Sequence, residues 1–189
     1  VDVYQNGNHY QQLYKRGVPQ GDLAVIDKAQ NTGTTITFLP DSEIFETTNF
    51  NYDTIKARFR EIAFLNKGIK ISIADHRAEE PKQETFHYEG GINEYVNFLN
   101  KNKNVLFEKP VYVLKTDKDK EVEISLQYND TYNEIIYSYA NNINTEEGGT
   151  HLAGFKNSLT KIINEYGHRE KILKPEEKLS GDDVREGLT

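Results

Sequence analysis

Residues 141–156 read Asn-Asn-Ile-Asn-Thr-Glu-Glu-Gly-Gly-Thr-His-Leu-Ala-Gly-Phe-Lys, a paired-amide, paired-glycine turn that leads into an amphipathic helix. Apolar residues continue at helical spacing and predict a buried stripe that consists of Leu152, Phe155, Leu159, Ile162, Ile163 and Tyr166. Lys156 and Asn164 lie off this stripe. The pattern predicts a long helix with one core-facing side.

The two glycines suit a tight entry into this helix. Thr150 is the candidate cap, because a hydroxyl at this position can accept a hydrogen bond from the first free backbone amides. His151 is expected to hydrogen-bond the Asn141-Asn142 turn. These roles are structural, so we assign no catalytic role to His151.

Upstream of this helix the chain alternates between strand and helix patterns. Strands are expected at residues 1–5 and 9–14, joined by an Asn-Gly turn, and at 35–38, 69–73, 111–114, 122–126 and 135–139. Helices are expected from Tyr52 to the stop at Gly68, and at residues 92–99. Residues 75–84 have the composition of an exposed loop. Glu89-Gly90-Gly91 allows a turn and is the expected domain boundary.

Composition restricts the class of protein without identifying it. With 189 residues, 36% hydrophobic and 28% charged, the chain suits one or two domains. It has no apolar run near the roughly 20 residues of a membrane helix, which favours a cytoplasmic protein. The absence of cysteine excludes disulfides, and a net charge of -7 argues against a chain-wide nucleic-acid footprint but not against a local basic patch. The chain opens inside a strand pattern and lacks methionine, so we expect a fragment of something longer.

The residues alone show no catalytic or metal-binding motif. There is no phosphate-binding loop followed by lysine and no nucleophile elbow, and none of the five histidines has a partner at metal-ligand spacing. We therefore expect no catalytic residue and no metal ligand within this chain. Taken alone, the pattern favours a non-enzymatic α/β binding or scaffold module.

Several motifs besides residues 141–156 resemble the ATPase subunits of bacterial type II topoisomerases. They are Lys15-Arg16-Gly17-Val18-Pro19, Thr32-Gly33-Thr34, Ala63-Phe64-Leu65-Asn66-Lys67-Gly68, His87-Tyr88-Glu89-Gly90-Gly91 and Gly181-Asp182-Asp183-Val184-Arg185-Glu186-Gly187-Leu188. The resemblance covers nearly the whole chain. Within the family, Tyr88–Gly91 and Phe64–Asn66 are more similar to DNA gyrase B subunits than to topoisomerase IV.

The resemblance implies an α/β (α+β) fold with two parts. Residues 1–91 would be the distal, C-terminal part of a GHKL-type ATPase sandwich, and residues 92–189 a transducer domain of the ribosomal-protein-like α/β fold, incomplete at its C-terminus. It also implies an ATP-driven dimer gate that couples hydrolysis to duplex passage and negative supercoiling. The alternatives are the topoisomerase IV ATPase subunit, which decatenates and relaxes DNA, and a non-enzymatic scaffold or interaction module.

The resemblance further implies site residues, cofactors and partners. Thr34 would join the hydrogen-bond network around adenine, Ile36 would form an apolar wall of that pocket, and Gln5 would stand at its mouth, where relatives usually carry arginine. Lys156 would face DNA in the cavity between two subunits. The cofactors would be ATP and Mg²⁺, with the magnesium ligand and general base upstream of this chain, so the chain alone should not hydrolyse ATP. The partners would be DNA, the gyrase A subunit and a second copy of the gyrase B subunit.

Overall fold

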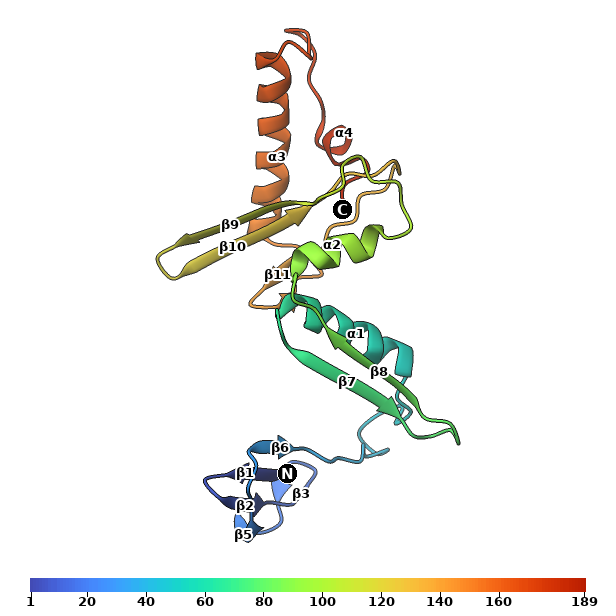
Figure 1. Cartoon of the computed structure of the whole chain (residues 1–189), viewed down its shortest axis with the longest axis vertical. Helices are drawn as coiled ribbons and strands as arrows, with labels where there is room; N and C mark the ends of the chain where they lie inside the picture. Colours follow the sequence, from blue (N-terminus) through green and yellow to red (C-terminus); the bar gives the residue numbers. More distant parts are fainter. The chain divides into compact units, whose positions relative to one another are not determined.

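A computed structural model describes all residues from Val1 to Thr189. The chain forms two compact units, Val1–Asn51 and Tyr52–Thr189. Both contain regular secondary structure, and helices occur only in the second (Figure 1). None of these helices is both long and apolar enough to cross a membrane. The predicted mixed α/β fold is confirmed.

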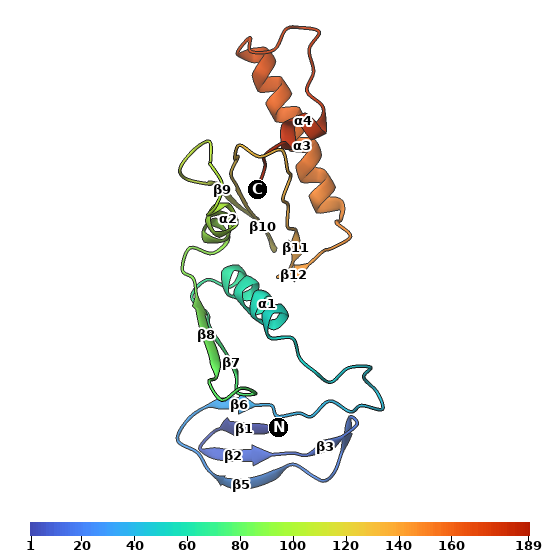
Figure 2. The same cartoon turned by 90° about the vertical axis from the view of Figure 1, so that its right-hand side faces the viewer.

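The first unit is built on a four-stranded antiparallel sheet. Its strands are β1 (Asp2–Gln5), β2 (Asn8–Gln11), β5 (Ala24–Lys28) and β6 (Gly33–Thr35), in the order β5-β2-β1-β6, and Figure 2 shows them side by side. The predicted hairpin is confirmed, because Asn6 and Gly7 have φ values of 52° and 75° and so join β1 to β2 with both turn residues left-handed. A second small hairpin pairs β3 (Tyr14–Lys15) with β4 (Val18–Pro19).

The strand predicted at residues 35–38 is wrong in its placement. Strand β6 ends at Thr35, which pairs with Asp2 near the start of β1. A strand needs a hydrogen-bonded neighbour, and β1 offers no further ladder residue beyond that point. Ile36 and Phe38 consequently lie outside the sheet, 67% and 70% exposed.

The second unit begins with a helix packed on a hairpin. Helix α1 (Tyr52–Leu65) lies against β7 (Lys70–Asp75) and β8 (Lys82–His87). Ala63, Ile73 and Phe86 form the buried core between them. The predicted helix and its stop are confirmed, since Gly68 has a φ of 78°. The predicted loop is too long, because Lys82 already pairs with Asp75 at the start of β8. Only Phe86 is buried in β8, so the strand had little apolar alternation.

The helix predicted after Gly90-Gly91 is confirmed as α2 (Ile92–Asn100). The next two predicted strands are confirmed as β9 (Val111–Asp117) and β10 (Lys120–Leu126), which form a hairpin with Lys118 at a φ of 55°. The strand predicted at residues 135–139 is wrong. The Ile135 amide donates to the carbonyl of Leu188 instead of to a neighbouring strand, and regular pairing starts only at β11 (Tyr139–Ala140).

Strand β11 pairs with β12 (Ile143–Asn144) across the paired-amide turn, in which Asn141 and Asn142 have φ values of 50° and 63°. Asparagine tolerates this left-handed backbone better than other residues with a side chain. The turn leads through the paired glycines into helix α3 (Thr150–Arg169). A short helix α4 (Gly181–Arg185) follows, and Ser180 and Asp183 form a reciprocal capping box at its start.

Helix α3 is confirmed, but the predicted apolar stripe is wrong at its C-terminal end. Ile162 and Tyr166 are 61% and 50% exposed, whereas Asn164 and Gly167 are buried. The reason is the chain that returns from α3 to α4. Leu173 lies so close to Gly167 that an added Cβ would meet it at 2.7 Å, and the Asn164 side chain donates to the carbonyl of Leu179 and accepts from its amide.

A buried polar cluster fixes the last residues of the chain. The Asn100 amide donates to the side-chain oxygen of Gln127 at 2.9 Å, and the Thr189 hydroxyl donates to the side-chain oxygen of Asn100 at 2.8 Å. The Asn129 amide donates to the carbonyl of Gly187 at 2.8 Å. Each of these polar groups is paired, which offsets the cost of burying it.

Candidate functional site

The β1–β6 register determines which of the expected nucleotide-binding residues share a face. Thr34 lies directly opposite Val3, and directly opposed residues of antiparallel strands project from the same face. Gln5 is two residues along β1 from Val3, so it projects from this face as well. Both Gln5 and Thr34 are exposed. The sheet therefore brings Gln5 and Thr34 to one face, with Val3 between them.

The opposite face of the same sheet carries a self-contained polar cluster. Asp2 accepts hydrogen bonds from Gln11 and from the His9 ring, each at 2.9 Å. These bonds, led by that from Gln11, hold the pKa of Asp2 below its usual range. Tyr4 stacks on His9 with ring centroids 4.3 Å apart. Thr35 is paired with Asp2 and so belongs to this second face.

Ile36, the third expected nucleotide-binding residue, follows the end of β6. It is exposed and has no ladder partner on β1. An extended chain would bring Ile36 back to the Thr34 face, because side chains alternate along a strand. The sheet itself orients Gln5 and Thr34 but not Ile36.

Lys156, the expected DNA-facing residue, belongs to a charge network on the second unit. Its Nζ atom lies 2.5 Å from Oε1 of Glu134, and Arg185 Nε lies 2.6 Å from the other carboxylate oxygen. Burial acts to raise the pKa of Glu134, but the hydrogen bonds from Lys156 and Arg185 lower it below the usual range. Lys156 is still 31% exposed. Its charge is thus shared between Glu134 and solvent.

The entry to α3 differs in detail from the sequence-based expectation. Gly149 occupies the cap position and makes no side-chain capping bond, so the role expected of Thr150 is wrong. The His151 ring lies 3.4 Å from the hydroxyl of Thr145 and not on the paired-amide turn. A Cβ at Gly149 would lie 2.8 Å from the His151 ring, so a larger residue there would have to displace this exposed side chain.

A joint between α1 and later segments was not predicted. The Tyr139 hydroxyl donates to Glu61 of α1 at 2.5 Å, and the Asn142 amide donates to Asn66 at 2.9 Å. Burial, together with the bond to Glu61, raises the pKa of Tyr139 far above its ordinary value. No sequence pattern could reveal these pairs, because their members are 78 and 76 residues apart.

Aromatic rings form the apolar part of this joint. Phe64 of α1, only 1% exposed, stacks on Tyr88 with ring centroids 3.6 Å apart and on Tyr95 of α2 with centroids 4.8 Å apart. Burial raises the pKa of Tyr95 to about 12. Phe64 thus connects α1 to α2 across the expected domain boundary.

A further polar contact joins the residue just past α1 to the β9–β10 hairpin. Lys67 Nζ lies 2.8 Å from Oε1 of Glu123, and the Tyr112 hydroxyl donates to the same oxygen at 2.7 Å. Sequence patterns assigned no function to any of these three residues.

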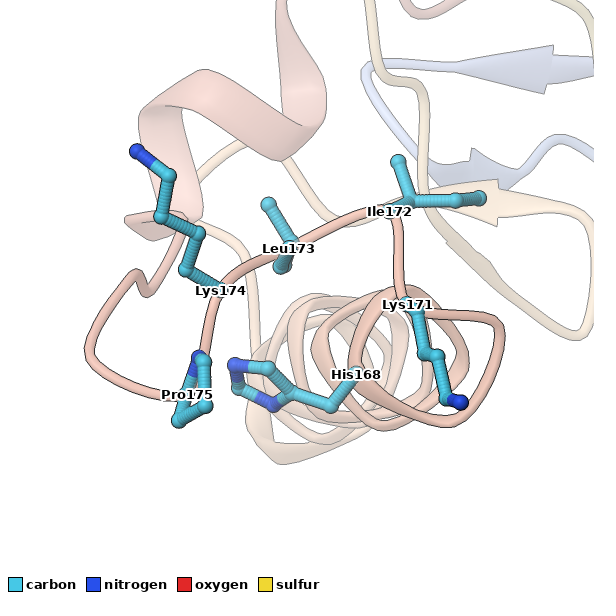
Figure 3. A pocket seen from close by; sticks show the side chains of 6 residues that line it. All are labelled: His168, Lys171, Ile172, Leu173, Lys174 and Pro175. Atoms are coloured by element: carbon cyan, nitrogen blue, oxygen red, sulfur yellow. The ribbon is translucent and has the colours of Figure 1, made fainter.

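An open cavity of about 650 Å³ lies at the C-terminal end of α3 and does not include any of the expected site residues. It is lined by His168, Lys171, Ile172, Leu173, Lys174 and Pro175 (Figure 3). The side chains of Lys171 and Lys174 extend away from each other on either side of His168 (Figure 3). The His168 ring is already hydrogen-bonded to the carbonyl of Glu177 at 2.8 Å. No group of three or more His, Asp or Glu side chains is placed to hold a metal ion.

Comparison with known proteins places this geometry in a family. The chain is 53% identical over 191 aligned residues to the DNA gyrase B protein of Staphylococcus epidermidis, and the match covers 100% of this chain and 30% of that protein. The chain thus spans less than a third of the length of this relative.

Solved structures show the same fold. The 43K ATPase domain of Thermus thermophilus gyrase B, solved in complex with an aminocoumarin, is 35% identical with a TM-score of 0.79, and the match covers 99% of this chain and 51% of that one. The topoisomerase IV ATP-binding domain of Francisella tularensis, solved with a small-molecule inhibitor, is 24% identical with a TM-score of 0.76 over 99% of this chain and 50% of that one. At that identity it shows a common fold alone.

The family model for DNA gyrase B matches residues 91–189, which is more than half of the chain. The motifs that indicated a type II topoisomerase ATPase subunit are therefore confirmed, and the chain belongs to the DNA gyrase B family, of whose members it forms one part.

Proposed function

We propose that this chain is the distal part of the ATPase domain together with most of the transducer domain of a gyrase B protein. In the intact protein, ATP binding brings two gyrase B copies together as a gate, and hydrolysis drives passage of one duplex through another to introduce negative supercoils. The observation that carries this proposal is the 53% identity to a DNA gyrase B protein along the whole chain. We also propose a gyrase A subunit and DNA as the remaining partners, and the cytoplasm as the location of the protein.

Gln5 and Thr34 are proposed as the contribution of the first unit to the ATP site. Their common, exposed face supports this assignment, because a hydroxyl and an amide both donate and accept hydrogen bonds, as an adenine edge requires. Ile36, exposed just after the end of β6, would add apolar contact to the nucleotide. From the family resemblance, we propose that the residues that hold Mg²⁺ and act as general base lie outside this chain.

Lys156 is proposed as a phosphate contact for the passing DNA. Its partial exposure supports this, and so does the second cation on Glu134, because Arg185 can balance the carboxylate when Lys156 turns to a phosphate. Lysine acts here as a point charge, so a single flexible contact is sufficient.

We propose Gly91 as the boundary between the ATPase and transducer domains, giving residues 1–91 and 92–189. The start of the family model at Gly91 and the start of α2 at Ile92 support this division. Residues 52–91 still pack within the same compact unit as the transducer part. The proposed boundary therefore differs from the division between the two compact units. Contacts cross it, including those of Phe64 with Tyr95 and of Glu61 with Tyr139.

Reconstitution tests the proposal and separates it from its alternatives. The full-length protein is combined with a gyrase A subunit on relaxed circular DNA, with and without ATP. Negative supercoils that appear only with ATP are expected. Decatenation and relaxation without supercoiling would instead identify a topoisomerase IV subunit, and absence of any ATP-dependent change in DNA topology would leave a scaffold or interaction module. The purified 1–189 chain is expected to show no ATP turnover.

A further inference from the structure

Lys67, Tyr112 and Glu123 form a closed set of contacts between the end of α1 and the β9–β10 hairpin. Lys67 Nζ donates to Glu123 Oε1 at 2.8 Å and to the Tyr112 hydroxyl at 3.2 Å. The Tyr112 hydroxyl donates to that same carboxylate oxygen at 2.7 Å, and the Lys67 ammonium lies 5.2 Å from the centre of the Tyr112 ring. Each member contacts the other two, although Lys67 is 45 and 56 residues away from its partners.

The backbone at the start of α2 is shaped to let Lys67 reach the hairpin. Gly91 has a φ of 60°, and a Cβ at this position would lie 2.2 Å from Cε and 2.8 Å from Cγ of Lys67. The positive φ favours glycine here, and any larger residue would also have to displace the lysine chain from its present path. The Lys67 side chain thus packs over the start of α2 on its way to Glu123.

The contact is also partly exposed to solvent. The side chains of Lys67 and Glu123 are 47% and 28% exposed, and exposed ion pairs add little to folding stability. Burial, Lys67 and Tyr112 all act on the pKa of Glu123, and the two hydrogen bonds keep it below its usual range. The carboxylate is thus charged at neutral pH and available to the lysine.

We propose that Lys67, Tyr112 and Glu123 act as a latch that positions the β9–β10 hairpin against the end of α1 and so couples the nucleotide-binding part to the DNA-facing part. The inference rests on the proposed function. We assign all three as positioning residues, which act through the placement of the hairpin. The side chains of Val111, Val113 and Val122 on the hairpin are exposed. Apart from the latch, the polar side-chain contact between the hairpin and a preceding helix is the hydrogen bond from Ser125 to Asn93 of α2. The latch therefore gives the end of α1 a direct contact with this hairpin.

The test uses the full-length protein with its gyrase A partner on relaxed circular DNA. Glu123→Gln removes the negative charge of the latch. The double substitution Lys67→Glu and Glu123→Lys restores the ion pair in the opposite orientation. Glu84→Gln is the matched control, because Glu84 pairs with Lys56 and Arg60 of α1 entirely within residues 52–91. The readouts are supercoils introduced per ATP hydrolysed and amide hydrogen exchange across residues 111–126.

Glu123→Gln is expected to lower supercoils per ATP about twofold to fivefold and to speed exchange in the hairpin, in keeping with loss of one exposed ion pair. Glu84→Gln should change neither readout, and the double substitution of Lys67 and Glu123 should recover most of the loss. The latch is overturned if Glu123→Gln leaves the number of supercoils per ATP unchanged, or if the double substitution does not recover the loss. If the wild-type protein shows no ATP-dependent supercoiling, the proposed function is refuted instead. Faster amide hydrogen exchange of the hairpin in Glu123→Gln alone supports the latch contact independently of activity.

Discussion

Thr34→Val in the full-length protein should weaken ATP binding without weakening the fold. Threonine and valine are both β-branched and suit a strand equally, and Thr34 is exposed at the edge of the sheet. The exchange should therefore change the free energy of unfolding by less than about 0.5 kcal/mol. The hydroxyl matters only when a nucleotide covers it, because its loss then leaves a buried polar partner unsatisfied.

That loss is expected to cost about 1–3 kcal/mol of binding free energy. It corresponds to roughly a 5-fold to 150-fold increase in Kd for a non-hydrolysable ATP analogue. Titration calorimetry on the wild-type and variant proteins measures the change directly, and thermal unfolding without nucleotide verifies that the fold is intact.

The β1–β6 register supplies the control. Thr35 is the next residue of β6, but it lies opposite Asp2 and projects from the other face of the sheet. Thr35→Val should leave the Kd within about twofold of wild type, because this substitution removes a hydroxyl that faces away from the proposed site. An unchanged affinity in Thr34→Val, or an equal loss in both variants, would refute the assignment of this face to the nucleotide.

Three further predictions concern the second unit. Lys156→Gln in the full-length protein should reduce the stimulation of ATP hydrolysis by DNA, with a defect that shrinks as salt rises, while Lys156→Arg retains most activity; equal loss of basal and stimulated rates would point to packing instead. Phe64→Ala should destabilise the 1–189 chain by about 3–5 kcal/mol in urea unfolding, against less than about 1 kcal/mol for the 61% exposed Ile162→Ala, and similar values would contradict the aromatic joint. Because the pKa of Glu134 is lowered in the folded chain, its stabilising effect should be present above the unfolded value of about 4.3 and lost as pH falls through the folded value. Thermal unfolding from pH 7 to 3 should show a shallower decline for Glu134→Gln, and parallel curves would remove Glu134 from this account.

The helices and hairpins that depend on local patterns were predictable. Helices α1, α2 and α3 follow from apolar residues at helical spacing, and the turn at Asn6 follows from a residue pair that tolerates left-handed backbone. The family resemblance also came from local motifs, and comparison with known proteins confirmed it. Strand β8 escaped prediction because its single buried residue, Phe86, produces no alternation.

For the candidate site, the family resemblance named residues but not their surroundings, and the assignment of those residues stays a prediction. The sequence pointed to Thr34, Gln5 and Lys156, but their surroundings depend on pairing between distant segments. The β1–β6 register orients Thr34 and Gln5 toward one face, and Glu134 becomes a partner of Lys156 only because a segment 22 residues away along the chain packs beside α3. Such contacts have no local pattern.

Sequence by itself determined the Asn6-Gly7 turn, the presence of helices α1, α2 and α3, and the family to which the chain belongs, because spacing, glycine placement and short motifs act over a few residues. Tertiary structure alone decided which polar residues are buried. Asn164 is covered by the chain returning from α3, and the buried Asn100 amide donates to the side-chain oxygen of the buried Gln127. The physical reason is that burial of a polar group requires a partner, and each of these partners lies 15 or more residues away in the chain.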